Sequence, residues 1–225
     1  VGMEDPTRYR NKGSFPFGAM GNSAVFGFFA ERSHRLVPFS DCPIQDERIV
    51  DAARRVAAWA NACGVPVYDE TTGEGQLRHV VARTTAEGEL MVTVVTKGQL
   101  KKKDDLLSFL EDIDSVWHNE NPKLTNVVFG EKFTLLSGKQ TLTETIGNKR
   151  FSVSPQSFLQ VNRVQTKVLY ETAREFLAAK KDETVVDAYC GVGTISLFIA
   201  EDCAHVVGIE QVAPAIEDAK ANAKA

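Results

Sequence analysis

Two acids and two glycines near the end of the sequence have the types and the spacing of a nucleotide-binding site. Asp187 and Glu210 each end an apolar run that is typical of a buried strand, and Gly191 and Gly193 stand between these runs. Glycines allow a backbone to turn tightly beside a ligand, and an acid at a strand end can accept hydrogen bonds from ribose hydroxyls. The pattern predicts that a nucleotide-like cofactor binds at the carboxyl edge of an open α/β sheet.

The glycine spacing favours one cofactor over another. The segment Gly191-Val-Gly193-Thr-Ile-Ser196 has a serine where the dinucleotide fingerprint has its third glycine. S-adenosylmethionine has no diphosphate that the turn would have to hold, and it therefore fits this turn better than NAD. NAD binding and a purely structural glycine turn are the alternatives that the spacing leaves open.

Hydrophobic periodicity predicts the elements that hold these residues. A strand, a helix, a second strand and a second helix are expected over residues 184–188, 194–201, 205–210 and 214–225. This alternation predicts parallel strands with right-handed crossovers. A long amphipathic helix is expected before them, with Ser154 as its N-cap, Pro155 in its first position and an end near Ala178.

The sequence pattern of the first 150 residues predicts shorter elements. We expect a helix from Pro43 to about Gly64, a hairpin that turns at Glu87-Gly88, and a short helix over residues 104–113. Strands are expected over residues 77–84, 89–96, 115–118, 126–129, 134–136 and 140–146. The fold class is therefore α/β, with a mixed α+β central domain over residues 1–150. The start of a Rossmann-like domain, with the turn that fits S-adenosylmethionine, follows over residues 151–225.

The composition is that of an ordinary globular protein. Of the 225 residues, 43% are hydrophobic and 25% are charged, and the net charge of −4 gives no overall bias towards nucleic acid. No apolar run approaches the length of a membrane span, so no membrane partner is expected. Four dispersed cysteines favour a reducing, cytoplasmic location, and we expect a monomer. Because the sequence begins with Val1 and ends one helix after Glu210, we also expect a piece of a longer protein.

Several motifs are similar to those of one enzyme family. The segment Asp187-Ala-Tyr-Cys-Gly-Val-Gly-Thr194 resembles the cofactor motif of the RNA uracil-C5 methyltransferases, which make 5-methyluridine in ribosomal and transfer RNA. Similarity extends to the segment before their catalytic domain and to their central-domain signatures, at residues 151–162, 9–12, 32–34, 77–79 and 125–130. The resemblance covers nearly the whole chain and is closer to the enzymes of bacterial 23S ribosomal RNA.

The resemblance implies roles for particular residues. Gln160 is expected to contact the methionine or sugar part of S-adenosylmethionine, Tyr189 to line the cofactor pocket, and Glu210 to bind the ribose. Asp187 and the two glycines complete the cofactor-binding set. The alternatives are a helix-surface amide for Gln160, a core aromatic for Tyr189 and a solvated strand end for Glu210.

The reaction that the resemblance implies needs a cysteine nucleophile. In this family a thiolate adds to C6 of uracil, C5 attacks the methyl sulfonium, and a base then removes the C5 proton. The family places the nucleophile, the base and a further cofactor-binding acid beyond the position of Ala225, and its small N-terminal β-barrel has no counterpart here. We therefore expect the chain alone to be inactive. Cys63, Cys190 and Cys203 are interpreted as packing residues.

Cys42 has a separate interpretation. Many members of the family hold a 4Fe–4S cluster, and Cys42 matches the position of its fourth cysteine ligand. A single cysteine cannot hold such a cluster. Cys42 is therefore a candidate ligand only in a longer parent, and in this chain we expect it to be a buried thiol.

The expected partner is RNA, with ribosomal RNA ahead of transfer RNA. Seven residues are expected to face it and to position its phosphates: Arg8, Arg10, Lys12, Arg32, His34, Arg78 and His79. Two competing hypotheses are a non-catalytic RNA-binding module and an unrelated Rossmann enzyme that uses NAD or acts on a small molecule.

Overall fold

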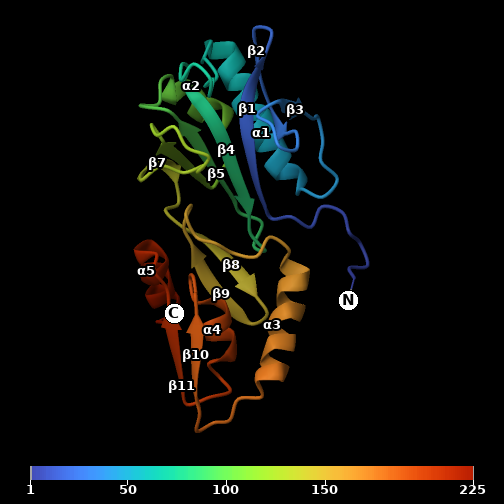
Figure 1. Ribbon diagram of the computed structural model, residues 1–225, viewed down its shortest axis with the longest axis vertical. Coiled ribbons are helices and arrows are strands. Elements are labelled where there is room, and N and C mark those ends of the chain that lie inside the picture. Colours follow the sequence, from blue (N-terminus) through green and yellow to red (C-terminus); the bar gives the residue numbers. More distant parts are fainter. Residues whose placement is uncertain (1, 225) are drawn as a thin grey trace. The chain divides into compact units, whose positions relative to one another are not determined.

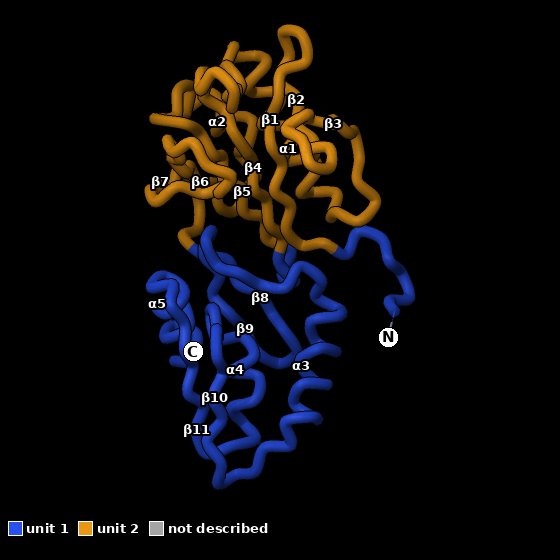
Figure 2. The backbone as a smooth tube through the Cα atoms, in the orientation of Figure 1, with its two compact units in different colours: residues 1–9, 85–88, 141–225 blue, residues 10–84, 89–140 orange. Residues whose placement is uncertain are grey.

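Two compact units make up the described part of the chain, residues 2–224 of the computed structural model (Figures 1 and 2). Arg10–Thr84 and Glu89–Gln140 form the N-terminal unit, which is orange in Figure 2. Thr85–Gly88 and the remaining described residues form the C-terminal unit, which is blue. The chain therefore passes from one unit to the other more than once.

The N-terminal unit is built on one sheet. Within its described residues the strand order is β3-β2-β1-β4-β5-β6-β7, and all neighbouring strands are antiparallel except β5 and β6. The strands are β1 (Lys12–Met20), β2 (Ser23–Phe29), β3 (Leu36–Pro38), β4 (Leu77–Thr84), β5 (Leu90–Thr96), β6 (Ser115–Glu120) and β7 (Lys132–Gly138). The short helix α2 (Lys103–Phe109) lies between the parallel strands β5 and β6 in the sequence, as a crossover connection requires.

Helix α1 (Glu47–Cys63) supplies much of the core of this unit. Asp46 caps its first turn by accepting a hydrogen bond from the Arg48 N–H, and Gly64 ends it in the left-handed conformation. Val56 and Trp59 on its apolar side are fully buried, in one cluster with side chains of the sheet. The predicted helix and its Gly64 end are confirmed, but the helix begins at Glu47 and not at Pro43, because Asp46 caps it. The hairpin of β4 and β5 is also confirmed.

The C-terminal unit contains two pairs of strands and three helices among its described residues. The antiparallel hairpin is β8 (Leu142–Ile146) with β9 (Lys149–Val153), and the parallel pair is β10 (Thr184–Ala188) with β11 (His205–Ile209). The helices are α3 (Arg163–Leu177), α4 (Thr194–Ile199) and α5 (Ala213–Asn222). Phe151, Tyr170 and Phe198 are buried in one cluster, which joins the hairpin to α3 and α4. The predicted strand-helix-strand-helix order is confirmed.

Helix α3 begins later than the sequence predicts. Its N-cap is Asn162, whose side chain accepts a hydrogen bond from the Gln165 N–H. The hydroxyls of Ser154 and Ser157 instead donate to the Asp218 carboxylate, at 2.9 and 2.7 Å. The prediction of Ser154 as an N-cap is wrong, because a distant acid on α5 holds this serine in a non-helical turn.

Two further expectations differ from the structure. Residues 126–129 form no strand, since the Asn121 amide donates to the backbone carbonyls of Val127 and Val128 and so replaces a neighbouring strand. The structural division also precedes the predicted boundary after residue 150. Residues 141–150 belong to the C-terminal unit because β8 pairs with β9.

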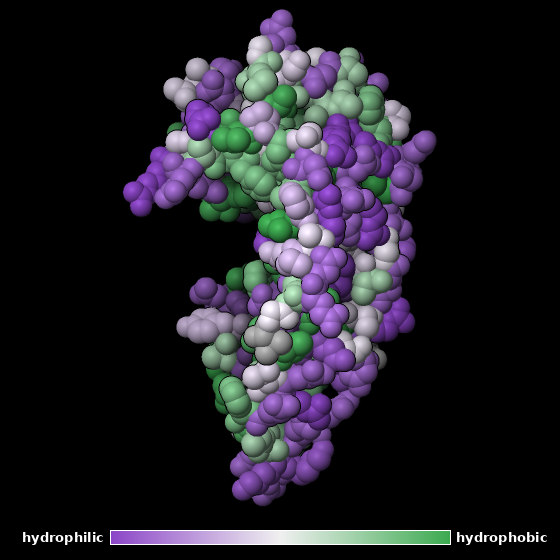
Figure 3. Space-filling model, turned by 90° about the vertical axis from the view of Figure 1, so that its right-hand side faces the viewer, coloured by the Kyte–Doolittle hydropathy of each residue, from purple (hydrophilic) through white to green (hydrophobic). Residues whose placement is uncertain are grey.

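Apolar side chains reach the surface of both units, as the green areas among the purple in Figure 3 show on the face drawn there. In the β10–β11 pair, Val186, Val207 and Ile209 are each about half exposed, whereas Val185 is buried. One face of this pair is therefore packed and the other is open. Among the described residues, we find no helix that combines the length and the apolar character needed to cross a membrane.

Candidate cofactor-binding site

The turn between β10 and α4 has an unusual backbone. Tyr189, Gly191 and Gly193 have φ angles of 65°, 57° and 80°. Glycine adopts this region freely, whereas a tyrosine there costs about 1–3 kcal/mol, and such strain is concentrated at functional sites. The prediction that these glycines form a tight turn at the end of a strand is therefore confirmed.

Glu210 ties the end of β11 to this turn. One carboxylate oxygen accepts a hydrogen bond from the Gly191 N–H at 3.1 Å, and the other accepts from Gln211 and Val212 at 2.7 and 2.8 Å. The bond from Val212 contributes most to lowering the pKa of Glu210, with burial acting in the opposite direction. An ionised carboxylate thus lies directly beside the glycine turn.

Asp187 and Cys190 complete the edge of the two strands. Asp187 lies near the carboxyl end of β10 and accepts a hydrogen bond from the Ser196 hydroxyl on α4. A Cβ added to Gly208 would come within 2.9 Å of the Cys190 sulfur. Cys190 is buried, and burial raises the pKa of its thiol, with the nearby acids adding to the effect. This agrees with the interpretation of Cys190 as a packing residue.

The other predicted residues lie at the surface. The Tyr189 side chain is 83% exposed, so the alternative of a core aromatic is wrong. Gln160 is exposed and lines a hollow of about 480 Å³ along α3, together with Asn162 and Leu169. The structure brings Asp187, Gly191 and Glu210 together. A shared site for Gln160 with them stays a prediction.

Three buried side chains that sequence reasoning missed support the turn from outside. The Asn222 amide on α5 donates to the Val192 carbonyl at 3.1 Å, and its oxygen accepts from the Ser152 N–H at 2.7 Å. The hydroxyls of Tyr170 and Thr194 lie 2.7 Å apart, which joins α3 to the start of α4. An asparagine on an otherwise alanine-rich helix was the available signal for the first of these.

The structure places Cys42 in the N-terminal unit, half-buried against the core. In residues 2–224, no group of three or more His, Cys, Asp or Glu side chains could hold a metal ion. The cluster ligand expected for a longer parent therefore stays a prediction.

Arg78 is not a surface residue. It is 3% exposed, and its guanidinium donates to the backbone carbonyls of Asn121, Lys123 and Thr125. It also stacks on Tyr68, with 4.6 Å between the guanidinium carbon and the ring centroid. The expectation that Arg78 positions RNA phosphates is wrong, because its donors hold the loop after β6.

Lys12 also differs from an exposed phosphate-binding lysine. Its side chain is partly buried, and burial lowers the pKa of its ammonium group to about 8, with the charge of Arg83 adding to the effect. Arg32, by contrast, has a side chain that is 92% exposed. Of these two expected RNA-facing residues, Arg32 is the more exposed, and its guanidinium lies 3.5 Å from the similarly exposed Glu31 carboxylate.

Curated proteins are similar to the chain over its full length. A protein of Halalkalibacterium halodurans named as an uncharacterized RNA methyltransferase is 45% identical over 230 aligned residues, and one of Clostridium tetani is 43% identical over 230. The chain resembles RNA methyltransferases. It spans about half the length of the curated relatives it matches, since the alignments cover 100% of the chain and 50% of each relative. No protein-family model matches the sequence.

A solved structure has the same fold over almost the whole chain. It is the crystal structure of Pyrococcus abyssi tRNA (uracil-54, C5)-methyltransferase in complex with S-adenosyl-L-homocysteine. The TM-score is 0.80 and the identity 25%, over 98% of this chain and 54% of that chain. The predicted α/β fold is confirmed, and it matches the fold of this methyltransferase.

Proposed function

We propose that the chain forms the ribose side of an S-adenosylmethionine site in an enzyme that methylates RNA. The observation that carries the proposal is the contact between Glu210 and Gly191, which places an ionised acid beside a positive-φ turn at the carboxyl edge of parallel strands. The similarity to proteins named RNA methyltransferases supports the RNA substrate. The methyltransferase with bound S-adenosyl-L-homocysteine supports the cofactor.

The side chains at the turn fit this cofactor. A carboxylate has about four acceptor positions, and in the described structure Glu210 uses three of them for backbone N–H groups. The remaining position can accept a ribose hydroxyl without breaking the turn. The exposed Tyr189 ring on the same turn offers a flat apolar surface to an adenosine or a methionine chain.

The same geometry disfavours NAD. Ser196 stands where a dinucleotide site has its third glycine, and its hydroxyl is engaged by Asp187. A diphosphate would bring two negative charges to a turn that already carries the Asp187 and Glu210 carboxylates. An S-adenosylmethionine molecule, which has a sulfonium cation and no phosphate, avoids that repulsion.

Within this function we propose C5 of a uridine as the methylated atom and a cysteine thiolate as the nucleophile. The cofactor supplies an electrophilic methyl group. The cysteines of the chain do not suit the thiolate role, because Cys190 and Cys203 are buried and Cys42 and Cys63 pack against the N-terminal core. The contribution of this chain is to bind and orient the methyl donor, and we expect it to transfer no methyl group by itself.

Calorimetric titration of the chain tests the cofactor. S-adenosyl-L-homocysteine is expected to bind, and NAD is not. Glu210→Gln should weaken binding by about tenfold to a hundredfold, since a charged acceptor is lost beside the ribose. Glu217→Gln on the exposed face of α5 is the matched control and should bind as the parent chain does. NAD binding without S-adenosyl-L-homocysteine binding would contradict the proposal.

A methyl-transfer assay tests the substrate. The protein continued to the full length of its relatives is incubated with radiolabelled S-adenosylmethionine and transcripts of ribosomal or transfer RNA. Label is expected at uridine C5 in one of these RNAs. Label on another base, or turnover by the 225-residue chain alone, would show that the proposed target or the proposed position of the nucleophile is wrong.

A further inference from the structure

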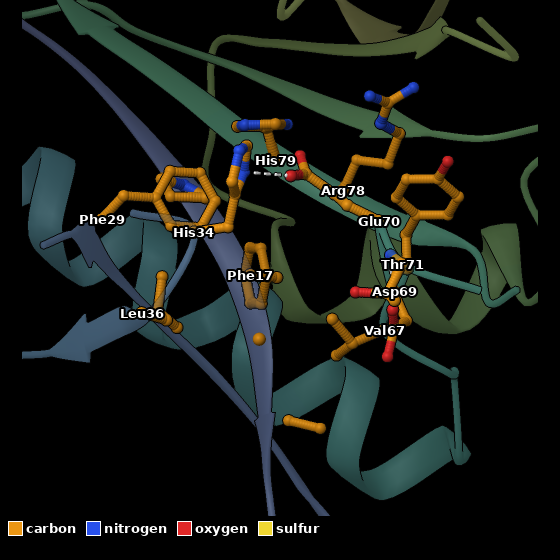
Figure 4. A pocket seen from close by; sticks show the side chains of 14 residues that line it. Phe17, Phe29, His34, Leu36, Val67, Asp69, Glu70, Thr71, Arg78 and His79 are labelled. Atoms are coloured by element: carbon orange, nitrogen blue, oxygen red, sulfur yellow. Dashed lines mark hydrogen bonds and ion pairs between the residues drawn. The ribbon is translucent and has the colours of Figure 1, made fainter. Parts of the chain in front are cut away.

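The N-terminal unit has a hollow of about 300 Å³ that the proposed cofactor site does not use (Figure 4). The side chains of Phe29, His34 and His79 lie on one side of it, and the loop of residues 67–71 lies on the other. The buried ring of Phe17 contributes to the lining. This volume is at the small end of the range for ligand pockets, so it suits one ring system.

A pair of side chains spans the hollow. His34 Nδ1 lies 2.6 Å from a carboxylate oxygen of Glu70, and the dashed line in Figure 4 marks this contact. A second hollow of about 370 Å³ shares Phe29, His34, Glu70 and His79 with the first. The two hollows are therefore adjacent, with the His34–Glu70 pair lining both, and together they are called the groove below.

His79 lines both hollows, but its Nδ1 does not face them. Its Nδ1 is buried and has no hydrogen-bond partner in the described structure. Burial lowers the pKa of the imidazole to about 4, and the charge of Arg78 adds to the effect, so the ring is neutral at pH 7. A neutral imidazole has one donor and one acceptor nitrogen. The imidazole of His79 is therefore an uncharged part of the wall.

The charges of the groove argue against a phosphate. Asp69 and Glu70 line it, and the carboxylate of Asp69 accepts hydrogen bonds from backbone N–H groups, which lowers its pKa and keeps it ionised. Arg78 also lines the first hollow, but its guanidinium donates to three backbone carbonyls. The groove thus combines hydrogen-bond acceptors with an aromatic ring, that of Phe29, which is 39% exposed.

We propose that this groove holds one unstacked base of an RNA strand that carries an amino group, with the base against Phe29 and its amino group towards Glu70. The proposal rests on the proposed function for the identity of the partner as RNA. Adenine, cytosine and guanine carry an exocyclic amine that can donate to the Glu70 carboxylate. Uracil would direct a carbonyl oxygen at the carboxylate. Stacking on aromatic side chains and reading of base edges are general modes of single-strand recognition.

Fluorescence anisotropy with labelled RNA hexamers of A, C or U tests this assignment on the whole chain. The A and C hexamers are expected to bind more tightly than the U hexamer. Phe29→Ala should weaken binding of the A hexamer by about tenfold, which is the usual scale for loss of one stacked base. Phe176→Ala is the control, since this phenylalanine is 85% exposed on α3 and lies outside the groove. An unchanged affinity after Phe29→Ala would overturn the proposal.

A second variant makes the test independent of total affinity. Glu70→Gln keeps the shape of the side chain but gives it an amide that can donate to a carbonyl, so the preference for A over U should disappear. A preserved preference would overturn the assignment of the base edge. Inorganic phosphate serves as a competitor in the same assay. If it displaces the A hexamer from the parent chain but not from Phe29→Ala, the groove is an anion site, and this result would also overturn the proposal.

The same preparations separate this proposal from the proposed function. Phe29→Ala should bind S-adenosyl-L-homocysteine as the parent chain does, because the groove and the glycine turn lie in different units. A chain that prefers the A hexamer but fails to bind S-adenosyl-L-homocysteine supports the groove and contradicts the cofactor. A chain that binds the cofactor without any preference among hexamers contradicts the groove alone.

Discussion

The hydroxyls of Tyr170 and Thr194 lie 2.7 Å apart in the interior of the C-terminal unit, where both residues are at least nine-tenths buried. Thr194 is the first residue of α4, directly after Gly193. A hydrogen bond from α3 thus reaches the end of the cofactor turn. The energetic coupling between the two hydroxyls can therefore be measured.

Tyr170→Phe should destabilise the chain by about 1–3 kcal/mol, because it leaves the Thr194 hydroxyl buried without that partner. Thr194→Val should have a similar cost for the same reason. In the double variant both hydroxyls are gone, so the loss of free energy of unfolding should be smaller than the sum of the single losses. Urea denaturation of the four proteins measures this. Additive losses would show that the two hydroxyls do not interact.

Gly208→Ala should destabilise the β10–β11 pair, since the new Cβ would lie 2.9 Å from the Cys190 sulfur. Overpacking of this kind costs about 1–3 kcal/mol. Adding Cys190→Ala removes the sulfur and should recover part of the loss. Gly98→Ala is the matched control, because a Cβ there would have open space and the backbone is not left-handed. Thermal unfolding compares the variants, and equal midpoints for the two alanine substitutions would contradict the steric argument.

Arg78→Lys should destabilise the N-terminal unit by about 3 kcal/mol, because a lysine cannot reproduce the bonds to three carbonyls. It should leave the salt dependence of RNA binding unchanged. Arg32→Ala removes an exposed charge that lies 3.5 Å from the Glu31 carboxylate. It should reduce the slope of log affinity against log salt by about one if Arg32 contacts a phosphate. A reduced slope in Arg78→Lys would restore the interpretation of Arg78 as a phosphate-binding residue.

The pKa of Glu210 lies below its usual value of 4.5, mainly because Val212 donates a hydrogen bond to its carboxylate. The stability that this ionised acid contributes is therefore present above the usual value and is lost as the pH falls through the lowered pKa. Binding of S-adenosyl-L-homocysteine should weaken over the same acidic range. Glu210→Gln should show a flatter pH profile below pH 4.5. Parallel profiles for the two proteins would show that another group is responsible.

The sequence predicted the elements that local patterns determine. Residues 184–188 coincide with β10, and Gly193 directly precedes α4, because a glycine turn after an apolar run is a local signal. The start of α3 depends on Ser154 and Asp218, which are 64 residues apart. A Ser-Pro pair has the local pattern of a helix start, and only the folded chain shows that its hydroxyl is engaged elsewhere.

The candidate site was predicted in part for the same reason. The sequence indicated that Glu210 would lie near the glycine turn, but its three bonds to backbone N–H groups required the structure. Arg78 was misinterpreted because a charged residue in a strand pattern is usually exposed. Its partners come from the loop after β6, more than forty residues along the chain. Contacts of this range carry no signal in hydrophobic periodicity.

The turn Thr85–Gly88 lies within the β4–β5 hairpin in sequence but belongs to the C-terminal unit, where the Ala86 N–H donates to the buried Glu144 carboxylate at 3.0 Å. Cutting the chain after Gln140 therefore does not give two intact domains. The downstream piece would lose the Ala86 N–H donor, which the upstream piece carries. The two units are therefore not contiguous gene segments. A recombinant piece that keeps the C-terminal unit intact needs residues 85–88 together with residues 141–224.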